Sequence, residues 1–146
     1  LFQVLGQNIV HVGGHGAGQV AKACNQVLIA QTIAAVGEAF VLAKASGVDP
    51  AKVREALLGG FAGSRVLEAH GQRMLDGNYA PGFKARLHKK DMRITLETAS
   101  ELGIALPGAA LATQYINALV GAGKGDLDSS AIFGLQQALS SVGQQD

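Results

Sequence analysis

The sequence has 146 residues, of which 48% are hydrophobic and 16% are charged, and its formal net charge is +1 at pH 7. This length suits one ordinary domain with a core of its own, and so small a net charge argues against a nucleic-acid partner or an anionic membrane surface. The single cysteine, Cys24, excludes an intramolecular disulfide framework and is typical of a reducing compartment such as the cytoplasm.

The predicted elements begin with an extended entry, in which residues 9–12 could form a short strand. A run of glycines follows, and then a long, largely apolar helix is predicted from Gln19 to Ser46, because this stretch contains no proline. Gly47 is typical of the residue that follows a helix end. Asp49 and Pro50 predict the N-cap and first residue of a second helix, which ends at Leu58.

The rest of the chain is also predicted to be helical. Ser64 or a neighbour caps a helix through His70, and apolar residues at helical spacing predict another helix over residues 87–102. Two further helices are predicted, one from Pro107 to Gly121 and one capped by residues 128–130 that runs to Leu139. These elements predict an all-α domain of the helical-bundle type.

Two stretches without Asp, Glu, Lys or Arg were considered as membrane spans, residues 1–21 and residues 103–123. Glycines interrupt the first, and Pro107, Gln114 and Asn117 interrupt the second, so neither predicts a span. No signal-peptide pattern is present. The sequence does not begin with methionine, and we expect it to be part of a longer protein.

The glycine run contains a dinucleotide-binding pattern. Residues 16–21 fit G-x-G-x-x-G/A, which in a cofactor site leads from one strand to a helix and needs an acidic residue after a second strand. Here Glu38 has the right spacing but lies inside the predicted long helix. We therefore interpret these glycines as a tight turn that lets the backbone approach a ligand or another domain closely, with helical N–H groups beside it that favour an anion.

Three polar residues share one face at the start of the long helix. Lys22, Asn25 and Gln26 are spaced i, i+3, i+4, among small and apolar neighbours. One interpretation is a lysine at the rim of an apolar face, with its ammonium in water. The other is a partly desolvated ammonium held by two amides at a cleft, where it could act as a general acid or base.

A second polar cluster is PGFKARLHKKDMR, residues 81–93. Its charges are typical of a solvated helix start, with Asp91 offsetting its basic neighbours. The alternative is a rim that faces an anion, such as a cofactor phosphate or a substrate carboxylate. The histidines lack metal-ligand spacing, so no metal site is predicted, and no nucleophile-elbow motif is present.

Three segments together resemble the C-terminal domain of the β-hydroxyacid dehydrogenases: GHGAGQVAKACNQVLIA, VDPAKVREALLGGFAGSRVLE and PGFKARLHKKDMRITLETASELGIALP. That family includes 3-hydroxyisobutyrate dehydrogenase and tartronate semialdehyde (2-hydroxy-3-oxopropionate) reductase, and is related to 6-phosphogluconate dehydrogenase. The resemblance covers about residues 6–140. It implies an all-α bundle with one long N-terminal interdomain helix, as in the 6-phosphogluconate dehydrogenase C-terminal domain.

The resemblance also implies roles for residues at the start of the long helix. Lys22 occupies the place of the family's catalytic general acid/base. Gly18 matches a glycine whose backbone approaches the substrate, and the pair Asn25 and Gln26 takes the place of substrate-binding asparagines. This pair and the Gly59–Ser64 stretch are similar to the reductase branch.

Further positions follow from the second polar cluster. Phe83 matches a residue that lines the substrate cleft. Lys90 and Asp91 match cofactor-side positions, Lys90 near the nicotinamide and Asp91 as a supporting partner.

The resemblance implies a division of the chain. Residues 1–12 would be a remnant of an N-terminal dinucleotide-binding domain or linker, residues 13–142 the helical substrate-binding and dimerisation domain, and residues 143–146 a tail. We expect NAD or NADP to be bound mainly by that N-terminal domain, so that this fragment alone is inactive.

The expected partners are a small 3-hydroxy or 3-oxo acid, the protein's own Rossmann domain, and further copies of the chain in a homodimer or homotetramer. The expected compartment is the cytoplasm, with no nucleic acid and no membrane. An alternative is a non-catalytic helical dimerisation or interaction module, built on the helix over residues 19–46 and the helix after Pro107.

Overall fold

The computed structural model describes residues 9–141, and over this range the chain is helical without a strand. The all-α prediction is confirmed. The elements, in chain order, are α2 (Ala17–Ala45), α3 (Pro50–Leu58), α4 (Arg65–Asp76), α5 (Ala85–Glu101), α6 (Pro107–Gly121), the short 3₁₀ helix η1 (Ser129–Ala131) and α7 (Ile132–Leu139).

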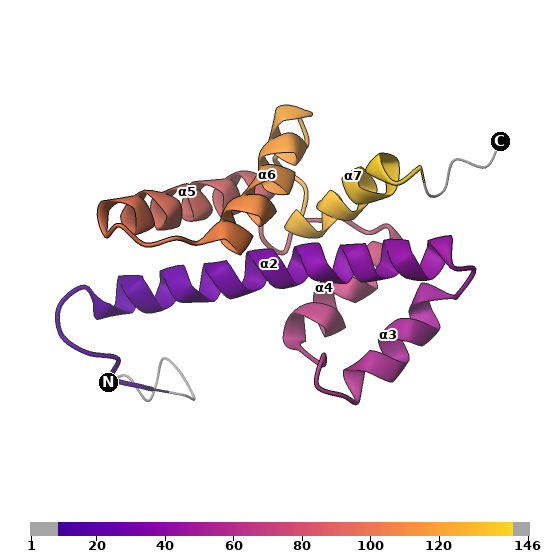
Figure 1. Ribbon diagram of the computed structural model, residues 1–146, viewed down its shortest axis with the longest axis horizontal. Coiled ribbons are helices and arrows are strands. Elements are labelled where there is room, and N and C mark those ends of the chain that lie inside the picture. Colours follow the sequence, from indigo (N-terminus) through magenta and orange to yellow (C-terminus); the bar gives the residue numbers. More distant parts are fainter. Residues whose placement is uncertain (1–8, 142–146) are drawn as a thin grey trace.

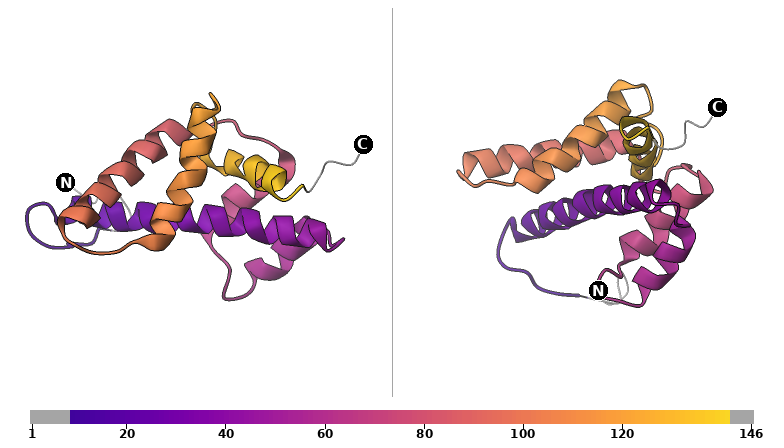
Figure 2. Two further views of the ribbon diagram at one scale, coloured as in Figure 1. Left: turned by 45° about the horizontal axis from the view of Figure 1, so that its top comes forward. Right: turned by 45° about the vertical axis from the view of Figure 1, so that its right-hand side comes forward.

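Helix α2 is the axis of the molecule. Figures 1 and 2 show α5, α6 and α7 against one side of it, and α3 and α4 against the other. Phe40 of α2 is fully buried and meets Phe133 of α7 edge to face, with ring centroids 6.1 Å apart. Other fully buried core residues come from α2, α5, α6 and α7: Ile33, Met92, Ile116, Leu119 and Ile132. Since both sides of α2 meet other helices, burial explains part of its apolar character, while Val20, Leu28 and Leu42 remain exposed.

The predicted helix ends have the expected capping contacts. The Asp49 side chain accepts a hydrogen bond from the backbone N–H of Ala51, and Ser64 accepts one from Leu67. Gly47 follows α2 with φ of 72°, a left-handed conformation that favours glycine. These local signals therefore ended and started helices where the sequence indicated.

The predicted strand over residues 9–12 is wrong. These residues are exposed and irregular, and the described part of the chain holds no strand against which they could pair. Residues 1–8 and 142–146 lie outside the described residues, so the predicted remnant at residues 1–12 and the tail at residues 143–146 stay predictions.

By length and composition alone, α2 would be long and apolar enough to cross a membrane. In its most apolar window, however, 44% of the residues are buried inside the molecule. Its buried positions face α4, α5, α6 and α7, which is the pattern of a core helix.

Gly37 marks the closest packing between α2 and α7. A Cβ built there would lie 1.8 Å from Oε1 of Gln136, a buried side chain whose Nε2 donates to the Ala34 carbonyl at 2.9 Å. We predict that Gly37→Ala destabilises the protein by about 1–3 kcal/mol, because Gln136 must give up this hydrogen bond.

The measurement is urea unfolding followed by circular dichroism. The control is Gly134→Ala on α7, where a Cβ meets nothing within 4 Å; it should leave stability unchanged or raise it by up to about 1 kcal/mol. Equal midpoints for the two variants would contradict the packing argument.

Candidate functional site

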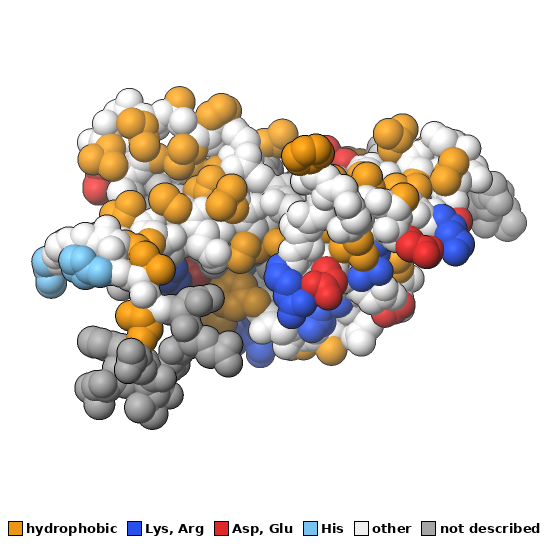
Figure 3. Space-filling model, turned by 90° about the horizontal axis from the view of Figure 1, so that it is seen from below, with side chains coloured by type: hydrophobic (Ala, Val, Ile, Leu, Met, Phe, Trp, Pro, Cys, Tyr) orange, Lys and Arg blue, Asp and Glu red, His pale blue; other side chains and the backbone are white. Residues whose placement is uncertain are grey.

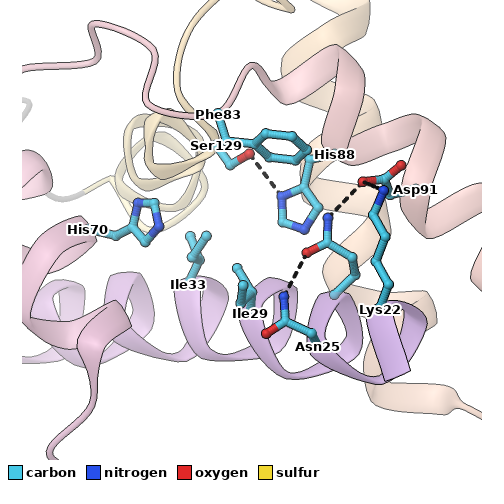
Figure 4. A pocket seen from close by; sticks show the side chains of 10 residues that line it. Lys22, Asn25, Ile29, Ile33, His70, Phe83, His88, Asp91 and Ser129 are labelled. Carbon is cyan, nitrogen blue, oxygen red and sulfur yellow. Dashed lines mark hydrogen bonds and ion pairs between the residues drawn. The ribbon is translucent and has the colours of Figure 1, made fainter. Parts of the chain in front are cut away.

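A cavity of about 330 Å³ lies beside the N-terminal half of α2. Figure 4 shows side chains from α2, α4, the start of α5 and η1 facing into it. Its walls combine apolar and polar groups from segments far apart in the sequence. They are Lys22, Asn25, Gln26, Ile29, Ile33, His70, Phe83, His88, Asp91 and Ser129.

Asp91 is the meeting point of the charged groups. Its side chain is 9% exposed, and its Oδ2 accepts a hydrogen bond from Nε2 of Gln26 at 2.9 Å. The Lys90 ammonium lies 3.1 Å from Oδ1. Burial raises the pKa of Asp91, but the hydrogen bonds from Lys90 and Gln26 and the nearby Lys22 charge outweigh it and hold this pKa below its ordinary value. The carboxyl group is therefore ionised at neutral pH.

Lys22 stands at the mouth of the cavity. Its Nζ lies 3.9 Å from Oδ2 of Asp91, and its side chain is 59% exposed. The described residues thus leave this ammonium largely open to solvent, and the partly desolvated ammonium that the sequence offered as one interpretation stays a prediction. The predicted grouping itself is found, because Lys22, Asn25 and Gln26 all line one cavity together with Phe83 and Asp91.

The two amides differ in what they contact. Gln26 is buried, and its NH₂ group donates a hydrogen bond to Asp91. Its Oε1 accepts a hydrogen bond from Nδ2 of Asn25 at 3.4 Å. Asn25 is exposed and faces the cavity (Figure 4). Gln26 therefore holds Asp91 in position, and the exposed side chain of Asn25 is accessible to a ligand.

A second groove, of about 300 Å³, adjoins the first. It is lined by Gln19, Lys90 and Ile94 among others, and it shares Lys22, Gln26 and Asp91 with the cavity. The Lys22–Gln26–Asp91 group therefore forms the wall between two adjacent hollows. Of the predicted cofactor-side residues, Asp91 lines both hollows, and Lys90 lines the groove only.

Gly18 is not brought to either hollow. It lies on the exposed first turn of α2, and a Cβ built there meets no atom within 4 Å of the described chain. The role that the resemblance implies for Gly18 therefore stays a prediction.

The floor of the cavity depends on Asp128, which the sequence indicated only as a helix cap. This residue is 0% exposed, and its carboxylate accepts hydrogen bonds from the backbone N–H groups of Gly82 and Phe83 and from the N–H and hydroxyl of Ser130. Nδ1 of His70 lies 3.3 Å away. Asp128 thus ties η1 to the loop that presents Phe83.

These hydrogen bonds keep Asp128 ionised. Burial raises its pKa, but the bonds from His70, Ser130 and Phe83 outweigh this effect and hold the pKa far below the ordinary value. The sequence signal for this role is the Asp-Ser-Ser run at residues 128–130, which equally predicts a plain helix cap.

His88 is the second residue that sequence reasoning missed. It is 1% exposed, packs against Phe83 with ring centroids 5.7 Å apart, and places Nδ1 2.9 Å from Oγ of Ser129. Burial lowers the pKa of His88 to about 4, although the charges of Asp91 and Asp128 act in the opposite direction. The imidazole is therefore neutral at pH 7.

The solvated interpretation of residues 81–93 is correct for only part of the cluster. Lys84 and Arg86 are exposed enough to pair with the exposed Asp126 at 2.9 and 2.8 Å. His88 and Asp91, by contrast, face inward. Helical periodicity separates the two sets, because the inward positions are three residues apart on the face of α5 that meets α2.

The site's groups are suited to binding and protonating a small polar molecule. They supply one ammonium, one exposed amide and one buried imidazole beside apolar walls. Over residues 9–141, no cluster of three His, Cys, Asp or Glu side chains is placed to hold a metal ion.

Comparison with known proteins relates this site to one family. Residues 16–136 match the family model described as the NAD-binding domain of NADP-dependent 3-hydroxyisobutyrate dehydrogenase. The 2-hydroxy-3-oxopropionate reductase of Escherichia coli is 46% identical over 132 residues, which cover 90% of this chain and 45% of that protein. The 3-hydroxyisobutyrate dehydrogenase of Pseudomonas aeruginosa is 35% identical over 119 residues, covering 77% and 40%.

A solved structure has the same arrangement of helices. The 3-hydroxyisobutyrate dehydrogenase of Salmonella typhimurium matches with a TM-score of 0.85 at 28% identity, covering 91% of this chain and 47% of that one. The chain thus spans about half the length of the relatives that it matches.

The buried neutral His88 predicts a pH-dependent stability. Its folded pKa of about 4 lies below the unfolded value of about 6.5, so between these values the unfolded state binds more protons. The contribution of His88 to the free energy of unfolding is fully present above about pH 6.5. As the pH falls toward 4, this contribution decreases by up to about 3 kcal/mol.

Urea unfolding at pH 7 and pH 5 checks this expectation, with His88→Gln showing a smaller loss on acidification than the wild type. The exposed His15 gives a matched control, since His15→Gln removes an imidazole outside this network. An unchanged acid loss in His88→Gln would assign the effect to other groups.

Proposed function

The chain belongs to the β-hydroxyacid dehydrogenase family, and we propose that it supplies that family's reaction with its proton-transferring and substrate-orienting side chains. The complete protein would interconvert a small 3-oxo acid and the corresponding 3-hydroxy acid with NAD or NADP. Residues 13–142 would be the substrate-binding and dimerisation domain.

One observation carries the proposal, namely the wall made by Lys22, Gln26 and Asp91 between two hollows. The Asp91 carboxylate is held by Gln26 at 2.9 Å and lies 3.9 Å from the Lys22 ammonium. This arrangement keeps an exposed proton donor at the edge of a cavity large enough for a small acid. An ion pair with a purely structural role would not need to lie between two hollows.

In the proposed reaction, Lys22 handles the proton. When bound, the nicotinamide cofactor supplies a hydride to the carbonyl carbon of the 3-oxo acid. The Lys22 ammonium donates a proton to the carbonyl oxygen as negative charge develops there, and its own charge stabilises the developing alkoxide. In the oxidative direction, the neutral amine removes the hydroxyl proton. Asn25 would orient the substrate by hydrogen bonding.

In this proposal, the hollows on the two sides of that wall bind different molecules, the acid and part of the cofactor. The cavity with Phe83 and Asn25 would take the acid. The donors beside the groove, Gln19 and the Lys90 ammonium, suit the amide or hydroxyl oxygens of a nicotinamide nucleoside. Asp91 would hold Lys90 and Lys22 in place without exchanging protons with the substrate. Most of the cofactor would be held by a Rossmann domain outside these residues.

For the substrate, we propose 2-hydroxy-3-oxopropionate, the compound in the name of the Escherichia coli relative. The Asn25-Gln26 pair supports this choice, because it is similar to the reductase branch of the family. The acid in the name of the Pseudomonas relative, 3-hydroxyisobutyrate, is the second candidate. The free thiol of Cys24 is consistent with our placing this chemistry in the cytoplasm.

We predict that Lys22→Ala in the complete protein lowers kcat by about 10²- to 10⁴-fold, because the proton donor is lost. Lys22→Arg should fail as well, since a guanidinium keeps its proton at neutral pH. Steady-state kinetics of 2-hydroxy-3-oxopropionate reduction provides the measurement.

The matched control is Lys52→Ala, which removes an exposed lysine paired with Glu55 on α3. It should retain wild-type turnover. Turnover near the wild-type level in Lys22→Ala would rule out Lys22 as the general acid.

A second, concurrent function is assembly. An apolar groove of about 430 Å³ runs between α2, the end of α5 and the segment after it. Four large apolar side chains stand exposed along it: Val20, Leu28, Leu102 and Ile104. Figure 3 shows hydrophobic side chains gathered over this end of the molecule, while charged side chains gather over α3 and α4. Such a patch favours contact with another protein surface, and we propose a homodimer or homotetramer.

We predict that the complete protein scatters light as a dimer or a larger oligomer. Leu28→Glu combined with Leu102→Glu should lower the measured mass, because charge would be placed in the groove. Leu139→Glu, at an exposed position on α7, is the control and should keep the wild-type mass. A wild-type monomer at high concentration would contradict this assembly.

A further inference from the structure

We infer that His88 is a substrate-binding residue: its neutral imidazole donates an Nε2–H hydrogen bond to an oxygen of the bound acid, and Ser129 selects the tautomer that makes this possible. The inference rests on the proposed function and adds a residue to the same site.

The first observation is an unsatisfied polar atom. His88 lines the cavity and is 1% exposed, yet its Nε2 has no hydrogen-bond partner among residues 9–141. Figure 4 shows the ring beside Phe83, with Nδ1 directed to Ser129. A buried polar group without a partner costs about 1–3 kcal/mol, and such a group beside a cavity is explained by a ligand that completes it.

The second observation concerns the proton on the ring. The Ser129 side chain is buried, and the hydrogen bond at 2.9 Å to Nδ1 of His88 is its only one in the described chain. If Nδ1 carried the proton, the Ser129 hydroxyl would have no acceptor for its own hydrogen. The satisfied arrangement has Ser129 donating to Nδ1, which leaves the ring proton on Nε2. His88 therefore offers a donor.

Burial keeps this donor neutral despite the carboxylates around it. The titratable groups that act on the ring are Asp91 on its own helix, His70 on α4, and Asp128 beside η1. Burial outweighs the two carboxylates and lowers the pKa of His88 to about 4. A neutral N–H donor therefore stands in the cavity at neutral pH.

The walls of the cavity indicate what this donor binds. Ile29, Ile33 and Phe83 are apolar, so a polar ligand must find its partners among few groups. Lys22 and Asn25 stand on the α2 side, and His88 projects from α5 (Figure 4). A small acid carries acceptor oxygens on its carboxylate and, in 2-hydroxy-3-oxopropionate, on its 2-hydroxyl group. One of these oxygens accepts from Nε2.

The test compares two variants of the complete protein. His88→Leu removes the donor, while His88→Gln keeps an N–H group at similar reach. We expect His88→Leu to raise KM for 2-hydroxy-3-oxopropionate by about 10- to 100-fold, with kcat changed by less than about 3-fold, and His88→Gln to recover most of this loss. A role limited to packing would lower the melting temperature of both variants and leave KM unchanged, which would overturn the inference.

A second substrate distinguishes the two oxygens. Methylmalonate semialdehyde has the carboxylate but lacks the 2-hydroxyl group. A raised KM for both substrates assigns the carboxylate, and a raised KM for 2-hydroxy-3-oxopropionate alone assigns the hydroxyl. An unchanged KM for both would again overturn the inference.

A measurement on the wild type remains decisive if the variants do not fold. In ¹⁵N NMR of the complete protein, the His88 imidazole should be protonated at Nε2, and added glycerate, the reduced product, should shift that N–H signal. Protonation at Nδ1, or no shift of the signal at saturating glycerate, would contradict the inference that His88 binds the substrate. The Lys22→Ala kinetics separate the two proposals: loss of turnover there, with no effect at His88, would leave the proposed function intact.

Discussion

The hydrogen bond from Gln26 to Asp91 joins the two helices on which the site depends. Its partners are 65 residues apart in sequence and lie 2.9 Å apart in a buried position. Because both groups are buried, removing Asp91 would leave the NH₂ group of Gln26 without its acceptor, whereas removing Gln26 would leave the Asp91 carboxylate with its lysine partners alone. The bond therefore holds α2 and α5 in one register. That register brings Lys22 of α2 to the Asp91 carboxylate, which the adjacent residue Lys90 also contacts.

A second constraint closes the other end of the cavity. Asp128 arrives from the chain segment between α6 and α7 and accepts the backbone N–H groups of Gly82 and Phe83. A fully buried carboxylate is stable only with such a set of donors. The loop that carries Phe83 is thus attached to the core just before α5 begins. Ser129, the next residue, then meets His88 one turn into that helix.

Helix α2 serves both stability and chemistry, and the division follows its length. Its C-terminal half holds Ile33 and Phe40 in the core. Its N-terminal half carries Lys22 and Asn25 and is open on one side, since no other helix of the described chain covers the lysine. A rigid helix that is anchored at one end can present side chains at the other with little loss of conformational entropy. This explains how an apolar helix can also carry the site.

The sequence by itself determined the local structure of the chain. Proline, glycine and capping residues such as Asp49 and Ser64 act within one or two turns, so helix ends could be placed without knowledge of distant contacts. The i, i+3, i+4 spacing likewise placed Lys22, Asn25 and Gln26 on one face. The resemblance to a known family then connected that face with Phe83 and Asp91.

Only the tertiary structure decided which polar groups are buried. His88 and Asp91 belong to a segment whose charges indicated a solvated helix, and Asp128 looked like an ordinary cap. Their burial depends on where α5 and η1 pack against α2, a matter of contacts between residues about 40 to 65 positions apart. The free energy of burying a charge is set by the donors that surround it in space. Sequence spacing carries no record of those donors.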